Sequence, residues 1–138
     1  MLTQIVKSFN GGYFASLKTS QHPVTISPIG INAECEHEIN ESEYQDCRNI
    51  IMAILTFEKP ISGSSYGLKH MVEPFTKSGY VSNGTLIKVC VDLGLTVKWP
   101  MHGVNATIHT PRKDPLFFNR IYNRASKERV DRVTLKKH

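Results

Sequence analysis

SSYGLKHMVEPFTKSGYVSNGTLIKVCVDL, residues 64–93, contains two helical patterns joined by a glycine-containing turn. The first helix is expected to begin at Ser64 or Ser65. Pro74 should kink or end it, because proline lacks the amide hydrogen that a helix interior needs. Gly79 then permits a left-handed turn out of the helix. The apolar face of this helix is formed by residues at i, i+3, i+4 and i+7: Leu68, Met71, Val72 and Phe75.

The second helix of this stretch is predicted from Ser82, a suitable N-cap, to Gly94, where it ends. It is apolar nearly all round, with Lys88 and Asp92 as its charged positions. A helix without a continuous polar face is expected in the interior of a domain. The sequence therefore predicts that this helix is central and buried.

The same outline, helix, short turn, helix, also fits a DNA-binding helix-turn-helix. A recognition helix must present polar side chains to the base edges of the major groove. Here the candidates are Ser82, Asn83, Thr85 and Lys88. Exposure of these residues would favour DNA binding, whereas burial would favour a core helix in a protein that binds other partners.

The segment before this core begins with short strands. Residues 13–17 and 24–26 are rich in aromatic and β-branched residues and are bounded by glycine or proline. Gly11-Gly12 is interpreted as a turn. Asn40 is the predicted N-cap of a further core helix, with Glu43 three residues later as in a capping box, and Pro60 ends the element.

After the core, residues 95–110 alternate like two strands of an antiparallel hairpin. Asp114 and Pro115 then predict the N-cap and first residue of a C-terminal helix. Its expected apolar face comprises Phe117, Phe118, Ile121 and Ala125. Basic residues at i, i+4 and i+7 form another face: Arg120, Arg124 and Lys127.

These patterns predict one α+β domain, in which a short antiparallel β-sheet packs on three to four helices. The 138 residues suit a single domain. Its parts are N-terminal strands and loop at 1–39, a helical core at 40–93, the hairpin at 95–110 and a basic helix with tail at 114–138. The longest apolar run is too short for a membrane helix, and three cysteines at irregular spacing fit reduced thiols, so we expect a cytoplasmic protein.

The net charge of +5 is unevenly distributed. Residues 112–138 hold nine basic and three acidic side chains, a local charge of +6, whereas the run from Glu34 to Asp46 is acidic. A basic amphipathic helix suits phosphate contacts with RNA or DNA, or an acidic protein surface. The alternative is a solvated helix, or one that pairs with the acidic run within the fold or across a dimer. The positions proposed to contact a partner are Arg120, Arg124, Lys127, Arg129 and Arg132, with Tyr66, Tyr80 and Trp99 as aromatic contacts.

Signatures of catalysis or metal binding are weak. Residues 63–67, GSSYG, formally match the nucleophile motif G-x-S-x-G, but no buried strand is predicted before it, so the serines are interpreted as helix-capping residues. Cys35, His37 and Cys47 lack the second close pair of ligands that zinc sites use. We therefore predict a protein that is not an enzyme and has no cofactor or metal.

Residues 64–109 resemble a family of small uncharacterised proteins carried by plasmids, conjugative elements and phages. The stretches that carry the resemblance are SSYGLKHMVE, GYVSNGTLIKVCVDLGL and GVNATIH, most clearly at Tyr66, Leu68, Lys69, His70, Tyr80, Ser82, Asn83 and Gly84.

The resemblance implies a role in counter-defence or maintenance of a mobile element. It suggests an anti-CRISPR protein, which blocks or disassembles a host CRISPR-Cas protein or ribonucleoprotein complex without catalysis. The alternatives are a helix-turn-helix-like DNA-binding autoregulator of a mobile element, and an interaction module that contacts no nucleic acid.

Overall fold

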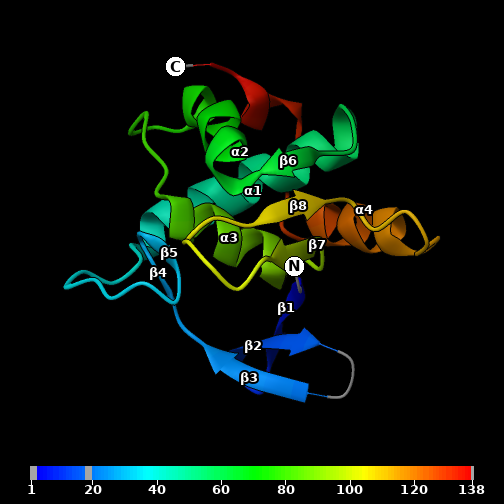
Figure 1. The fold of residues 1–138 in the computed structure, drawn as a ribbon. Helices are drawn as coiled ribbons and strands as arrows, with labels where there is room; N and C mark the ends of the chain where they lie inside the picture. Colours follow the sequence, from blue (N-terminus) through cyan, green and yellow to red (C-terminus); the bar gives the residue numbers. More distant parts are fainter. Residues whose placement is uncertain (1–2, 18–19, 138) are drawn as a thin grey trace.

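The protein is described by a computed structural model that places residues 3–17 and 20–137. It is an α+β domain, as the sequence predicts, in which a six-stranded antiparallel sheet packs against helices (Figure 1). The helices are α1 (Glu41–Phe57), α2 (Ser65–Val72), α3 (Asn83–Asp92) and α4 (Phe117–Lys127), with 3₁₀ turns η1 (Glu73–Phe75) and η2 (Arg132–Leu135). The strands are β1 (Gln4–Phe9), β2 (Gly12–Leu17), β3 (Ser20–Val24), β4 (Ile26–Ser27), β5 (Gly30–Ile31), β6 (Ser62–Ser64), β7 (Thr96–Trp99) and β8 (Thr107–His109).

The N-terminal strands and the 95–110 hairpin belong to one sheet, whose order is β3-β2-β1-β7-β8-β6. β1 and β7 join the two parts, with Ile5 opposite Lys98. β1 and β2 form a hairpin around Asn10 and Gly11, which both have positive φ. Figure 1 shows β2 and β3 at one edge of the sheet, connected to the rest of it through β1.

Helix α3 is the centre of the domain, because its apolar side chains are buried all round. It packs on β1 and β7 on one side and on α1 on another, and its first turn meets the β4–β5 hairpin. At its end, the Asp92 carboxylate accepts hydrogen bonds from the hydroxyls of Tyr13 (2.9 Å) and Tyr44 (2.5 Å). Burial and these contacts raise the pKa of both tyrosines. Asp92 thereby ties β2 and α1 to the central helix.

Helix α1 begins as the sequence predicts, since the Asn40 side chain accepts from the Glu43 amide at 2.9 Å. The expected return contact of a capping box is wrong for this helix. The Glu43 carboxylate turns away from Asn40 and accepts instead from the Ser82 amide (3.2 Å) and the Thr85 hydroxyl (2.5 Å). The side chain that would cap α1 therefore links it to the start of α3.

Helix α2 starts after Ser64, whose hydroxyl caps the Gly67 amide at 3.1 Å. At Pro74 the helix changes into the 3₁₀ turn η1, which confirms the expected effect of this proline. Gly79 has a φ of +76° and Gly94 a φ of +87°, in agreement with the two turns predicted after α2 and α3. The segment between α2 and α3 is a loop over residues 76–82, longer than the short turn of a helix-turn-helix.

The start and the apolar face of α4 differ from the prediction. The helix begins at Phe117, because Asp114 forms a turn of its own by accepting from the Leu116 amide at 3.0 Å. Phe117 is 1% exposed, whereas Phe118 is 41% exposed and lies outside the buried face. The tail after α4 returns to the domain, where Arg132 stacks on the Phe57 ring of α1.

Candidate functional site

Two exposed tyrosines from different elements flank one lysine. Tyr66 lies in α2 and Tyr80 in the 76–82 loop, and their side chains are 56% and 55% exposed. Lys69, which is 8% exposed, lies between them, with its ammonium nitrogen 5.6 Å from the Tyr66 ring centre and 5.1 Å from that of Tyr80. We call Tyr66, Lys69 and Tyr80 the tyrosine patch. A cation against two aromatic faces fixes the orientation of both rings.

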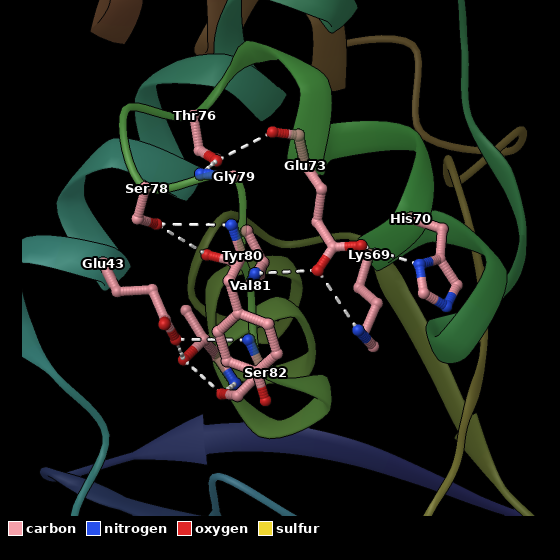
Figure 2. A network of polar contacts seen from close by, with 11 residues as sticks. Glu43, Lys69, His70, Glu73, Thr76, Ser78, Gly79, Tyr80, Val81 and Ser82 are labelled. Carbon is pink, nitrogen blue, oxygen red and sulfur yellow. Dashed lines mark hydrogen bonds and ion pairs between the residues drawn. The ribbon is translucent and has the colours of Figure 1, made fainter.

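The Glu73 carboxylate holds this patch together (Figure 2). It accepts from the Lys69 ammonium group at 3.3 Å and from the Val81 amide at 3.1 Å, and it contacts Nδ1 of His70 at 2.6 Å. Lys69 and His70 lie in α2, whereas Val81 lies in the loop that carries Tyr80. Glu73 therefore connects the two elements that present the tyrosines.

Two acidic side chains of α1 hold the other parts of the same loop. The Asp46 carboxylate accepts from the Lys77 amide at 3.0 Å, and Glu43 accepts from the Ser82 amide. These bonds satisfy backbone amides that the loop itself leaves without partners. The helical part of the acidic run is thus structural, because it orders the segment between α2 and α3.

Protonation of Glu73 should loosen this loop at acidic pH. Burial alone would raise the pKa of Glu73, but hydrogen bonds from Val81, His70 and Lys69 outweigh it, so that the pKa lies below the ordinary 4.5. The stabilisation is therefore present above the pKa of the unfolded chain and is lost as pH falls through the lower pKa of the folded state. We expect the Val81 amide resonance to titrate with a midpoint below pH 4.5 in NMR spectra.

The matched variant for this titration is Glu73→Gln, which keeps the shape of the side chain and removes its charge. It should abolish the low-pH transition of the Val81 amide. A midpoint at or above the ordinary value, or a transition that persists in Glu73→Gln, would contradict the assigned role of Glu73.

The basic residues of the C-terminal segment are all exposed, but their surroundings differ. Arg120 forms an ion pair with Asp114, and Arg132 stacks on Phe57. Arg129 follows the helix with a φ of +59°, a conformation that favours glycine. Arg124 and Lys127 form no ion pair within 4 Å to any residue that the structure describes. Within α4, the charges left for a partner are therefore those of Arg124 and Lys127.

Trp99 is not available for a partner, contrary to the prediction. It is 7% exposed at the end of β7, and its indole nitrogen donates to the Gly103 carbonyl at 3.2 Å. The ring packs into the core from the sheet. Sequence alone places it beside Pro100 at a strand end, a position that is compatible with either burial or exposure.

The side chains examined for catalysis have structural contacts. Ser65 in the G-x-S-x-G match is fully buried, and its hydroxyl accepts from the Ala106 amide at 3.1 Å. Burial raises the pKa of the Cys47 and Cys90 thiols, which disfavours their reactive thiolate form. Within residues 3–17 and 20–137, no group of three or more histidine, cysteine or acidic side chains is placed to hold a metal ion.

Sequence reasoning missed Lys69, His70 and Glu73 as parts of this site. A signal was present, because Glu73 follows Lys69 at i+4 and His70 at i+3, spacings at which side chains meet on a helix. The contact of Glu73 with Val81 could not be read in the same way, since it depends on how the loop returns to α2.

Comparisons of the chain with known protein families, curated proteins and solved structures find no match. Among the described helices, none combines the length and apolar character needed to cross a bilayer.

Proposed function

We propose that the protein is a non-enzymatic inhibitor of the anti-CRISPR type, encoded by a mobile genetic element, which binds a host CRISPR-Cas nucleoprotein complex in the bacterial cytoplasm. The observation that carries the proposal is the exposed basic face of α4, in which Arg124 and Lys127 project from a helix fixed to the core by Phe117, Ile121 and Ala125. Charges of this kind suit an RNA-filled groove or an acidic protein surface. The mobile-element origin rests on the sequence resemblance of residues 64–109.

The arrangement of ion pairs supports a partner outside the chain. If α4 served to neutralise the acidic run, its basic residues would contact residues 34–46. Instead Glu43 and Asp46 bind backbone amides of the 76–82 loop. In the part of the chain that the structure describes, the ion pair between α1 and the end of α4 joins a basic residue of α1, Arg48, to an acidic residue, Glu128. On the basic face of α4, the charges of Arg124 and Lys127 are therefore left for intermolecular contacts, whereas that of Arg120 is paired with Asp114.

The tyrosine patch offers a second contact of the same proposal. Interfaces are enriched in tyrosine and arginine, and rings that are already ordered lose little entropy on binding. Tyr66 and Tyr80 are held by Lys69 and by the loop contacts of Glu73. We propose that they contact the protein component of the host complex, while α4 lies against its acidic or nucleic-acid surface.

The burial of α3 disfavours the helix-turn-helix alternative, in which this helix would read DNA. Asn83 and Thr85 are buried, and Asn83 donates to the backbone carbonyls of Ile29 and Val104. Lys88 is half-buried against the Tyr44 ring. This burial favours a protein that binds other partners, because a recognition helix must present polar side chains to the major groove.

The test is affinity capture with the tagged protein from a bacterium with an active CRISPR system, with and without nuclease, followed by mass spectrometry and by a DNA-cleavage assay on the purified complex. We expect Cas subunits to be recovered after nuclease treatment. The double variant R124E/K127E should lose capture and inhibition, because both charges on the exposed face are reversed.

The matched control is K59E/K113E, which makes the same change of net charge at exposed positions outside α4. It should behave like the unmodified protein. Full inhibition by R124E/K127E would exclude α4 as the binding surface. Recovery of nucleic acid alone, or loss of all capture after nuclease treatment, would contradict direct binding to a Cas protein.

A further inference from the structure

One face of the six-stranded sheet is open to solvent. Along β1, β2, β7 and β8 alternate side chains point into the core, where Val6, Ala15, Val97 and Ile108 are buried. The side chains between them point to the opposite face, where Lys7 of β1 and Lys98 of β7 are exposed. We call this the outer face, and its main residues are Lys7, Phe9, Phe14, Gln21, Lys98 and Thr107.

Among the described residues, the outer face has basic and uncharged side chains and no acidic ones. In the part of the chain that the structure describes, none of the strands contains Asp or Glu. Lys7 and Lys98 are both exposed there. Two carboxylates border the cleft beside β1 and β7, and both have partners, since Asp92 binds Tyr13 and Tyr44 while Asp114 binds Arg120. The tyrosine hydroxyls are neutral, so Asp92 keeps its charge at the border of the face, whereas the charged side chains within the described strands are all basic.

Two aromatic rings lie on the same face. Phe9 is 65% exposed at the end of β1. Phe14 on β2 is directly opposite Lys7 in the antiparallel register. A depression of about 140 Å³ is lined by Lys7, Phe9 and Phe14 together with Ser8, Ser16 and Gln21. Apolar rings, an ammonium group and neutral hydrogen-bonding side chains thus surround one hollow.

We propose that the outer face binds single-stranded nucleic acid, with bases stacked on Phe9 and Phe14 and backbone phosphates near Lys7 and Lys98. Stacking on exposed rings requires unpaired bases, because the faces of paired bases are covered within a duplex. Lysines on neighbouring strands can follow a sugar-phosphate backbone that crosses the sheet, and the lack of carboxylates in the strands removes repulsion. This inference is independent of the proposed function, since it uses neither α4 nor the tyrosine patch.

Fluorescence anisotropy with labelled oligouridine and oligothymidine of about 15 nucleotides, and with a duplex of the same length, tests the proposal. We expect both single strands to bind more tightly than the duplex, and the ratio of the two affinities distinguishes RNA from DNA. Phe9→Ala should weaken binding about 5- to 150-fold, the range expected for the loss of one stacked base. The variant K7Q/K98Q should make the slope of log affinity against log salt less steep by about 1.4.

Matched variants separate this site from other parts of the protein. Phe118→Ala removes another exposed ring, and K59Q/K113Q removes two exposed charges, in both cases outside the hollow lined by Phe9 and Phe14. Both variants should bind the oligonucleotides normally. Absence of binding by the unmodified protein, preference for the duplex, or unchanged affinity of a folded Phe9→Ala variant would overturn the proposal, whatever the result for the host complex.

Discussion

Replacing Gly84 with alanine is expected to destabilise the domain by about 3 kcal/mol or more, even though alanine is the better helix former. Gly84 lies in the first turn of α3, and a Cβ atom there would be 1.5 Å from the Ser27 carbonyl oxygen and 2.5 Å from its carbon. The obstacle is backbone, so no rotamer change relieves it. The β4–β5 hairpin would have to move, with loss of the bond from the Gly84 amide to the Pro28 carbonyl (3.1 Å).

Urea denaturation followed by circular dichroism measures this effect as a shift of the midpoint at constant slope. The matched control is Gly67→Ala in α2, where the nearest contact of the added Cβ is the Ser64 hydroxyl oxygen at 3.3 Å. Its free energy of unfolding should stay within about 1 kcal/mol of that of the unmodified protein. Equal stability of the Gly84→Ala and Gly67→Ala variants would show that the hairpin does not lie against α3.

Replacing Phe117 with alanine should cost about 3–5 kcal/mol of unfolding free energy, the usual range for a buried phenylalanine. Phe117 is 1% exposed, and it fastens the start of α4 against the end of α3 near Gly94. Because α4 also carries Arg124 and Lys127, the same variant should weaken capture of the host complex at temperatures where α4 detaches.

Phe118→Ala is the control, because it makes the same change at the next residue of the same helix. Phe118 is 41% exposed and meets Phe117 edge to face, with ring centres 5.4 Å apart. Loss of that contact should cost about 1 kcal/mol. Thermal or urea unfolding distinguishes the two variants, and a larger loss for Phe118→Ala than for Phe117→Ala would mean that the helix is rotated relative to its described position.

Most helices could be predicted from local signals. The caps at Asn40, Ser64 and Ser82 are side chains that bond to amides three residues later, and such bonds need no distant partner. The burial of α3 follows from its apolar residues on every side, because no orientation would hide them from water in a surface helix. The boundary of α4 was predicted less well, since Asp114 can cap a helix or close a separate turn.

The strands were less predictable. Asn10-Gly11 is a strong signal for a hairpin, and it was missed in favour of Gly11-Gly12 as the turn. The short strand β6 has the sequence SGS, which lacks the β-branched and aromatic residues typical of strands. It is a strand because β8 is available to pair with it, with Gly63 opposite Ile108. Such a strand is set by its neighbour and not by its own composition.

For the candidate site, the sequence by itself determined that α4 is amphipathic and basic, because helical spacing alone places Arg124 and Lys127 away from Ile121 and Ala125. It also determined that α3 is central. Only the tertiary structure decided that Trp99 is buried, that Glu43 leaves its own helix for Ser82, and that Tyr66 and Tyr80 meet over Lys69. The physical reason is range: caps and amphipathic faces depend on residues within two helical turns, whereas these contacts join segments that only the packed core brings together.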